Sequence, residues 1–202
     1  GHWDVFVHDR LTGETVRVSV ASDGTQGNGT SSYADISANG GYVAFESDAS
    51  NLVEGDTNGT SDIFVRDLVS GTIIRVSVAS DGTEGDSDSY RPSISADGRY
   101  VAFYSYASNL VAGDTNGTYD IFVRDLLTST TERVSVDSGG AQGDGHCGFF
   151  YGGVALSADG RHVAFQSLST NLVPGDTNGR PDIFVHDRQT FATERGSVDS
   201  AG

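Results

Sequence analysis

The chain has 202 residues, and its 28 Asp and Glu outnumber its 12 Lys and Arg, so the formal net charge is −16 at pH 7. A surface this acidic repels phosphate backbones and anionic lipid, so we expect no nucleic-acid partner and favour cations. No apolar run approaches the roughly 18 residues that cross a bilayer, so we expect no membrane insertion. Cys147 is the single cysteine, which excludes an internal disulfide.

Short motifs recur along the chain at nearly constant spacing, which indicates a repeat protein. The motif D-I/V-F-V-R/H-D begins at Asp4, Asp62, Asp120 and Asp182, at intervals of 58, 58 and 62 residues. A second motif, N-L-V-x-G-D-T-N-G, begins at Asn51, Asn109 and Asn171. A third, S-A-D/N-G before an apolar segment, begins at Ser37, Ser95 and Ser157.

In chain order, the sequence predicts two β-strands at 4–9 and 15–20, and then four strands in each complete repeat. In the second repeat these cover 92–95, 100–104, 121–124 and 132–136, all rich in Val, Ile, Phe and Tyr. Asn-Gly or Asp-Gly pairs, which tolerate the positive φ of a tight hairpin, join the first two strands at Gly40, Gly98 and Gly160. No segment has helical periodicity.

The strands carry apolar residues on both faces, with Ile63 and Val65 alternating with Phe64. A sheet of this kind is covered by neighbours on both sides, as the blades of a β-propeller are. We therefore predict an all-β β-propeller of four-stranded antiparallel blades, with a half blade at 4–20 and blades at about 33–79, 91–137 and 153–199. A flat β-solenoid is the alternative, although its repeats would be shorter.

The pattern S-x-S-A-D-G-R-Y-V-A-F, followed by S-N-L-V-x-G-D-T-N-G-x-x-D-I-F-V-R-D, resembles the TolB-like, WD-related β-propeller repeats of bacterial secreted and periplasmic proteins. The resemblance covers nearly the whole chain. It implies a propeller scaffold that is often non-enzymatic and an extracellular or periplasmic location, but it does not fix a ligand.

The number of strands amounts to about three and a half blades, whereas closed propellers have roughly four to eight. An open arc leaves unpaired edges and an uncovered end blade. We therefore expect the chain to form a homo-oligomer or to belong to a longer polypeptide.

The motif D-T-N-G-x-x-D places two carboxylates and an amide beside each buried strand. Ca²⁺ prefers such oxygen ligands, and the glycine lets the chain turn sharply around an ion. The sequence thus predicts a structural calcium site in each complete repeat, although the same residues also build turns without metal. The candidate ligands are Asp56, Asn58, Asp62, Asp114, Asn116, Asp120, Asp176, Asn178 and Asp182.

Two further segments are candidates for binding. Acidic loops between the blades, such as 81–88, are expected on the same face as the D-T-N-G loops. The insertion 144–153 carries three consecutive aromatic residues that either pack or bind a ligand, and an inert buried Cys147. No hydrolase motif such as G-x-S-x-G or H-E-x-x-H is present.

Together these features predict a non-catalytic, calcium-stabilised, extracytoplasmic propeller module whose loop face binds protein or glycan. The alternatives are a fragment of a propeller-bearing hydrolase, whose catalytic residues lie elsewhere, and a structural subunit that assembles edge to edge.

Overall fold

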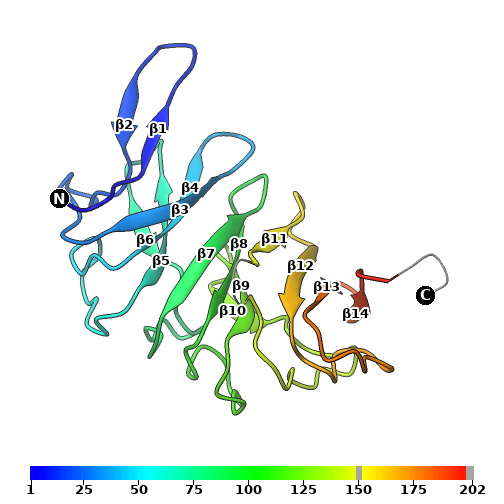
Figure 1. Ribbon diagram of the computed structural model, residues 1–202. Helices are drawn as coiled ribbons and strands as arrows, with labels where there is room; N and C mark the ends of the chain where they lie inside the picture. The colour runs from blue at the N-terminus through cyan, green and yellow to red at the C-terminus, as the bar shows by residue number, and fades with distance from the viewer. Residues whose placement is uncertain (149–151, 199–202) are drawn as a thin grey trace.

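The computed structural model describes residues 1–148 and 152–198, and within them the chain forms fourteen β-strands and no helix. They make one two-stranded and three four-stranded antiparallel sheets, which confirms the predicted all-β, propeller-type architecture (Figure 1). The half blade contains β1 (Phe6–His8) and β2 (Thr15–Arg17). Blade 1 contains β3 (Ser31–Ile36), β4 (Tyr42–Ser47), β5 (Asp62–Asp67) and β6 (Ile73–Arg75). Blade 2 contains β7 (Ser89–Ile94), β8 (Tyr100–Ser105), β9 (Asp120–Asp125) and β10 (Thr130–Arg133), and blade 3 contains β11 (Val154–Leu156), β12 (His162–Ser167), β13 (Asp182–Asp187) and β14 (Ala192–Arg195).

The blades follow one another in an arc, and each is a meander in which consecutive strands pair (Figure 1). The first strands β3, β7 and β11 contact one another from blade to blade and form the inner side of the arc. Hairpins that join the first and second strands lie at one end of every blade. The D-T-N-G loops and the loops between blades lie at the other end, which we call the loop face.

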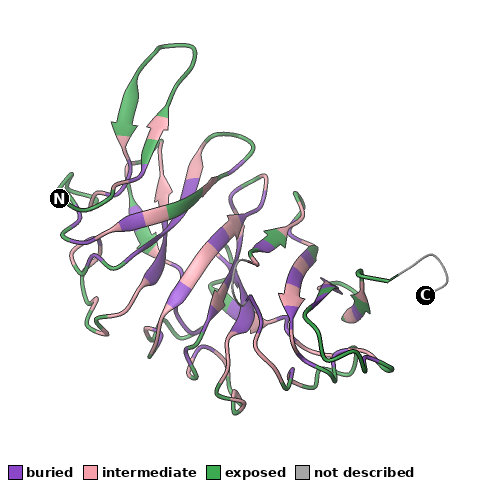
Figure 2. Ribbon diagram, viewed as in Figure 1, coloured by how far each residue is buried: buried purple, intermediate pink, exposed green. Residues whose placement is uncertain are grey.

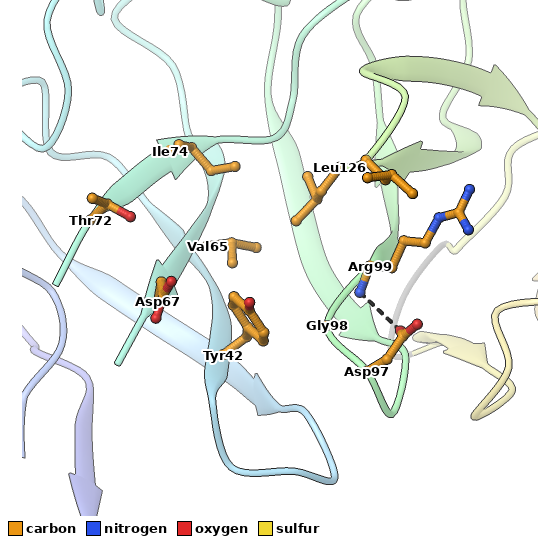
Figure 3. Close-up of a pocket in the computed structure, with 10 residues that line it drawn as sticks. Tyr42, Val65, Asp67, Thr72, Ile74, Asp97, Gly98, Arg99 and Leu126 are labelled. Atoms are coloured by element: carbon orange, nitrogen blue, oxygen red, sulfur yellow. Dashed lines mark hydrogen bonds between the residues drawn. The ribbon is translucent and has the colours of Figure 1, made fainter. Parts of the chain in front are cut away.

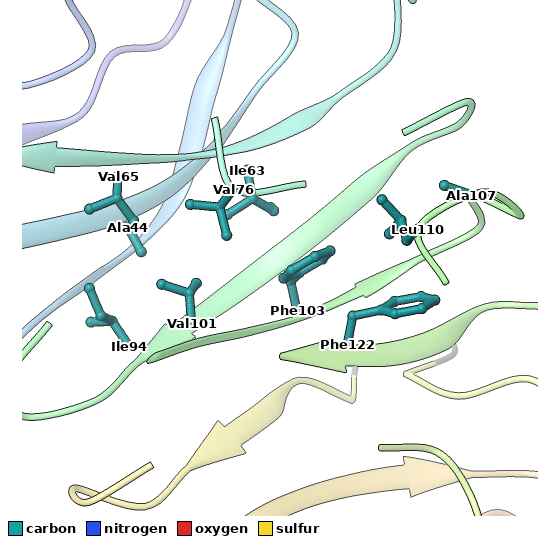
Figure 4. Close-up of a cluster of buried hydrophobic side chains, with 10 residues drawn as sticks. All are labelled: Ala44, Ile63, Val65, Val76, Ile94, Val101, Phe103, Ala107, Leu110 and Phe122. Atoms are coloured by element: carbon teal, nitrogen blue, oxygen red, sulfur yellow. The ribbon is translucent and has the colours of Figure 1, made fainter. Parts of the chain in front are cut away.

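The hydrophobic core lies between the blades rather than within any one of them (Figure 4). At the junction of blades 1 and 2, Ile63 and Val65 pack against Phe103 and Phe122. Phe64, on the opposite side of β5, belongs to the cluster that joins blade 1 to the half blade. This confirms the predicted alternation of β5 and explains why both of its faces are apolar.

The last junction surface is uncovered in the described structure. Ile183 of blade 3 occupies the position of Ile63 in blade 1, yet it is 44% exposed whereas Ile63 is fully buried. The loop that leads into β13 is also largely exposed (Figure 2). Gly196 also stands where the other blades have Val76 and Val134, so this surface of blade 3 is both exposed and smaller. An uncovered end blade is what the open arc was expected to leave.

Two strands of the second repeat differ from their predicted bounds. The fourth strand ends at Arg133 instead of 136, because the chain after Val134 turns into the loop between blades, where Val136 forms an isolated bridge with Gln142. The first strand begins at Ser89 rather than at 92, and a bulge near Arg91, whose φ is 47°, interrupts its pairing. The strand start was predicted wrongly because Pro92 and the bulge interrupt the alternation of apolar and polar residues there.

Repeated side chains hold the loop face together. Asn109 donates to the carbonyl of Glu84 and accepts from the Asp86 amide, so it attaches the preceding interblade loop to blade 2. The neighbouring Leu110 is buried in the blade 1–2 junction. None of the described residues forms a helix with the length and apolarity needed to cross a membrane.

Candidate functional site

The D-T-N-G loops bring the predicted ligands together, in three groups, at the loop face. In blade 1, Asp62 is the first residue of β5 and is completely buried. The side-chain amide of Asn58 donates to Asp62 Oδ2 over 3.1 Å. The same Asn58 nitrogen donates to the carbonyl of Gly85, in the loop that leads to blade 2. The motif therefore links its own blade to the next one.

A cationic side chain lies among these carboxylates. Nη1 of Arg75, at the end of β6, is 3.2 Å from Asp56 Oδ1, 3.4 Å from Asp62 Oδ2 and 2.8 Å from Glu84 Oε2. We call this arrangement, an arginine bound by the two aspartates of one D-T-N-G-x-x-D motif, the arginine latch. Because Glu84 belongs to the interblade loop, the latch of blade 1 also contacts the connection to blade 2.

Blades 2 and 3 repeat the latch with fewer charges. Arg133 Nη1 is 3.4 Å from Asp114 Oδ1 and 3.6 Å from Asp120 Oδ2, and Gln142 takes the place of Glu84. In blade 3 the corresponding distances from Arg195 to Asp176 and Asp182 are 3.4 and 3.8 Å. In the half blade Arg17 is 3.5 Å from Asp4.

A serine completes each latch. Ser77 donates to Asp62 Oδ1 over 2.5 Å and accepts from the backbone N–H of Ile63. Ser135 binds Asp120 in the same way. Each buried aspartate thus has partners on both oxygens, as buried carboxylates require.

Burial acts on the pKa values of the latch carboxyls in blades 1 and 2. Burial raises the pKa values of Asp62 and Asp120, against the opposing effect of their serine and arginine partners. Burial likewise raises the pKa values of Asp56 and Asp114. The Ser197 hydrogen bond instead lowers the pKa of Asp182, because among the described residues no loop of a following blade lies over it.

The latches bear directly on the calcium prediction. The predicted aspartates do converge, but Asn58 Nδ2 faces Asp62 and its oxygen accepts from Thr60, so this amide is engaged within the protein. No group of three or more His, Cys, Asp or Glu among the described residues is arranged to hold a metal ion. Calcium binding therefore stays a prediction, and the guanidinium supplies positive charge where calcium was expected to supply it.

The latch arginines were missed in the sequence, although a signal for them exists. Arg17, Arg75, Arg133 and Arg195 each precede a serine by two residues, in R-V-S or R-G-S. Residues two apart on an extended strand point to the same side, so both side chains can face the aspartate that begins the neighbouring strand. The same repeat spacing that marked the aspartates marks these arginines.

A second constellation lies at the inner side of the loop face, and we call it the inner rim: Tyr90, Tyr104, Tyr106, Tyr119 and His146, with Glu46 and Asp88. The rings of Tyr104 and Tyr119 meet edge to face with centroids 5.6 Å apart. Tyr106 lies 5.1 Å from Tyr119, and His146 lies 6.0 Å from it. Tyr90 lies in β7 and Tyr104 in β8, whereas Tyr106 and Tyr119 lie at the two ends of the β8–β9 connection and His146 lies in the loop between blades 2 and 3.

A cavity of about 350 Å³ lies beside Tyr90, between blades 1 and 2. The residues that line it include Glu46, Asp48 and Asp88 and no arginine, although the charge of the nearby Arg91 acts on Glu46. Glu46 is only 8% exposed, accepts from the Ser32 hydroxyl over 3.0 Å and from the Arg91 amide over 2.9 Å, and has its pKa raised by burial. The cavity is therefore lined by three acidic residues and one tyrosine.

The inner rim is where the repeats differ from one another. Ser47, Ser105 and Ser167 occupy one position of the repeat and are identical, but the residues on either side of them are not. The position before the serine holds Glu46, Tyr104 or Gln166, and the position after it holds Asp48, Tyr106 or Leu168. Likewise Ser61, Tyr119 and Pro181 precede the invariant aspartate of the next strand. Comparing the repeats position by position would have revealed these residues in the sequence.

The insertion 144–153 extends the same face. Cys147 is fully buried, and burial raises its pKa to about 12, so the thiol is not poised as a nucleophile. The aromatic run Phe149, Phe150 and Tyr151, expected to pack or to bind, lies outside the described residues.

A different groove opens at the hairpin end, opposite the loop face, also with a volume of about 350 Å³ (Figure 3). Tyr42 of blade 1 and Gly98 of blade 2 line it, together with Arg99, whose amide donates to Asp97 (Figure 3). Arg99 also forms a two-pronged ion pair with Asp125, with bonds of 2.9 and 2.7 Å. The side chains of Tyr42 and Arg99 in this groove therefore take part in packing and ion pairing of the blades.

Comparison with solved structures agrees with the repeat geometry. TolB from Acinetobacter baumannii superposes on 97% of the chain with a TM-score of 0.56 and 18% identity. A putative TolB from Agrobacterium tumefaciens covers 98% with a TM-score of 0.52 and 15% identity, and the tricorn protease covers 96% with 0.57 and 16%. The chain is structurally similar to TolB-like β-propeller domains over nearly its whole length. No family model and no curated protein sequence matches it.

The matched proteins are longer than this chain. It spans 38% of the A. baumannii TolB, 70% of the A. tumefaciens protein and 20% of the tricorn protease. At this level of identity the likeness establishes the β-propeller fold, and the fold by itself does not assign an activity.

Proposed function

We propose that this propeller segment is a non-catalytic binding module that works outside the cytoplasm and recognises its ligand at the inner rim. One observation carries the proposal: positions that pack between blades repeat from blade to blade, while neighbouring positions at the inner rim change. Packing imposes the same requirement on every blade, so positions free of that requirement can serve recognition. The similarity to TolB, a periplasmic protein, supports the location.

The ligand class that suits the rim is a peptide segment of another protein, with glycan as the second candidate. Tyrosine presents a large apolar ring with a polar tip, which makes it effective in recognition sites. Tyr106 is 43% exposed and therefore available to a partner. The net charge of −16 favours basic peptides over acidic ones.

Peptide and glycan arrays probed with the full chain test this function. We expect binding to basic peptides that Tyr106→Glu abolishes and Val69→Glu leaves intact. Val69 is the matched control because it is 91% exposed and lies in a hairpin at the opposite end of the blade. Equal loss in both variants, or binding that survives Tyr106→Glu, would remove the inner rim as the site.

The hydrolase alternative is tested by turnover. The tricorn protease and a prolyl endopeptidase are structurally similar to the chain, with TM-scores of 0.57 and 0.55. The chain is incubated with generic ester and peptide substrates, and we expect no turnover.

The assembly alternative is tested by solution mass, because a stable monomer is incompatible with edge-to-edge assembly.

A further inference from the structure

Blades 2 and 3 each carry a guanidinium clamp at the hairpin end. In blade 2, Nε and Nη2 of Arg99 donate to the two oxygens of Asp125 over 2.9 and 2.7 Å. In blade 3, Arg161 donates to Asp187 in the same way, over 2.9 and 2.6 Å. These carboxylates also accept backbone amides of the hairpin that follows, such as that of Leu127. A carboxylate at this position of the repeat therefore binds its own hairpin and an arginine together.

Blade 1 has the carboxylate without the arginine. Asp67 occupies the position of Asp125, and its Oδ1 atom accepts from the amides of Val69 and Ser70. The arginine position is Gly41, and Asp67 forms no ion pair with any of the described residues. The hairpin contacts of the clamp are thus present in blade 1, and its guanidinium is missing.

The arginine that precedes Asp67 does not replace the missing one. Hydrogen bonds from Ser70 and Val69 are the main causes that lower the pKa of Asp67, and the charge of Arg66 contributes less. The guanidinium of Arg66 is directed instead to two backbone carbonyls of the preceding interblade loop. Blade 2 has Arg124 at the same position and still carries its clamp.

The ring of Tyr42 lies beside this carboxylate, because Tyr42 and Asp67 are paired across β4 and β5 (Figure 3). Tyr42 is held in the same way as Tyr100 of blade 2. A β-carbon on Gly98 would lie 2.2 Å from Cδ2 of Tyr42, and one on Gly160 would lie 2.2 Å from Cδ2 of Tyr100. The two rings therefore present equivalent surfaces to their surroundings.

At the junction of blades 2 and 3 this ring surface is covered by arginine. The guanidinium carbons of Arg99 and Arg188 lie 4.7 and 4.4 Å from the centroid of Tyr100. At the junction of blades 1 and 2 the two corresponding residues are Gly41 and Leu126. The groove of about 350 Å³ between blades 1 and 2 is thus open at a place where the next junction holds guanidinium groups.

From this comparison of the blades we propose that the groove binds the guanidinium group of an arginine side chain from another protein. The carboxylate of Asp67 matches the parallel N–H donors of a guanidinium, and arginine stacks on aromatic rings such as that of Tyr42. Ile74 and Leu127 also line the groove, are 45% and 73% exposed, and suit the aliphatic part of the side chain. Asp97 adds a second acidic residue to the lining.

Arg99 also lines the groove, but it does not occupy the site, because its guanidinium is bound by both oxygens of Asp125. A lysine side chain suits the site less well than arginine, since an ammonium group is a point charge that cannot form two parallel hydrogen bonds. The groove lies at the opposite end of the blades from the inner rim. This inference therefore goes beyond the proposed function and does not depend on it.

The test titrates N-acetyl-L-arginine methylamide into the ¹⁵N-labelled full chain and follows the amide signals by NMR. N-acetyl-L-citrulline methylamide is the neutral isostere, because an oxygen replaces one guanidinium nitrogen. We expect the arginine compound to shift the amides of Asp67 and Gly98 and to leave that of Tyr106 in place. The citrulline compound should bind about tenfold more weakly or less, because the charge-assisted hydrogen bonds are lost.

Variants of blade 1 locate the binding. Gly41→Arg supplies the guanidinium from within the chain and should abolish the shifts, whereas Gly41→Ala should retain them. Asp67→Asn should weaken binding about tenfold while it keeps an oxygen for the hairpin amides. Asp9→Asn is the matched control, because Asp9 holds the same repeat position and accepts the amides of Leu11 and Thr12. Among the described residues its strand β1 pairs only with β2, so no tyrosine lies opposite Asp9.

Four results would each overturn the proposal. They are equal binding of the citrulline compound, no shift with the arginine compound, equal weakening by Asp9→Asn, and binding that survives in Gly41→Arg. Asp67→Asn is interpreted only where its spectrum shows a native fold. Gly41→Arg adds a contact rather than removing one, so it keeps the test decisive if Asp67→Asn does not fold.

Discussion

The ring of Tyr42 in blade 1 lies directly against the backbone of Gly98 in blade 2. A β-carbon on Gly98 would lie 2.2 Å from Cδ2 of Tyr42, and Gly98 has a φ of +80°. The contact recurs one blade further on, where a β-carbon on Gly160 would be 2.2 Å from Tyr100. Glycine at these turns therefore serves the junction between blades as well as the hairpin itself.

Gly98→Ala should destabilise the chain much more than Gly40→Ala. Both glycines have positive φ, which costs alanine about 1–2 kcal/mol, but Gly40 faces open space. At Gly98 the methyl group also displaces Tyr42, which adds about 1–3 kcal/mol. Urea unfolding of both variants measures the difference, and equal losses would show that the ring contact contributes nothing.

Arg133→Ala should unfold the blade 2–3 junction. Asp120 is fully buried, so removal of its cation leaves an unpaired buried charge, with a cost of about 3–5 kcal/mol. Arg10→Ala, at an exposed position of the first hairpin, is the control and should change stability by less than about 0.5 kcal/mol. A small effect at Arg133 would mean that Ser135 and Asn116 suffice to hold Asp120.

Gly41→Arg should stabilise blade 1. Gly41 stands where blades 2 and 3 have Arg99 and Arg161, which clamp Asp125 and Asp187, and Asp67 is the corresponding unclamped residue. The atoms nearest to a β-carbon at Gly41 would be those of the Asn39 side chain, with Oδ1 at 3.2 Å. We expect the melting temperature to rise by about 1–2 °C, a modest gain because the pair is partly exposed. The double variant with Asp67→Asn is the control and should lose the gain.

The clamp at Asp125 should make stability depend on acid. The Arg99 guanidinium holds the pKa of Asp125 well below its ordinary value of 3.8. Folded protein thus binds fewer protons than unfolded protein, so the clamp stabilises above about pH 4 and its contribution is lost as pH falls below that. The gap in urea midpoint between the native chain and Arg99→Ala should narrow from pH 5 to pH 2. A constant gap would show that Arg99 acts only through packing.

Calcium and the arginine latches make opposite predictions for chelation. If calcium occupies the D-T-N-G loops, EDTA lowers the melting temperature and added Ca²⁺ restores it. If the guanidinium groups suffice, as the contacts of Arg75 and Arg133 favour, the midpoint stays within about 1 °C. Differential scanning calorimetry with EDTA and then with excess CaCl₂ decides between them, and calorimetric Ca²⁺ binding would support the metal.

Much of the fold follows from local signals in the sequence. The Asp-Gly turns and the alternation of Ile63, Phe64 and Val65 specify hairpins whose two faces are both apolar, which only a stack of sheets can satisfy. The convergence of Asp56 and Asp62 followed from their spacing. The arginine that balances their charge was not predicted from the motif, because Arg75 lies 13 residues after Asp62 and on another strand.

The inner rim was less accessible to sequence reasoning. Tyr90 and Tyr119 lie 29 positions apart and share no motif, and the folded chain brings their ring centroids to 6.3 Å from each other. The ends of the first strands were also displaced by the bulge at Arg91. Such residues are recognised from what differs between repeats, whereas the motifs were found from what they share.

The location of the core between blades has a consequence for how such a chain can change length. Every junction joins the same two kinds of surface, one carrying Ile63 and Val65 and the other carrying Phe103 and Phe122. Duplication or deletion of one whole unit therefore leaves each surviving junction with its proper complement. Blade 3 is the exception, because Gly196 stands where blades 1 and 2 have a valine. A copy of blade 3 placed in the middle of the array would therefore leave a cavity at its junction with the next blade.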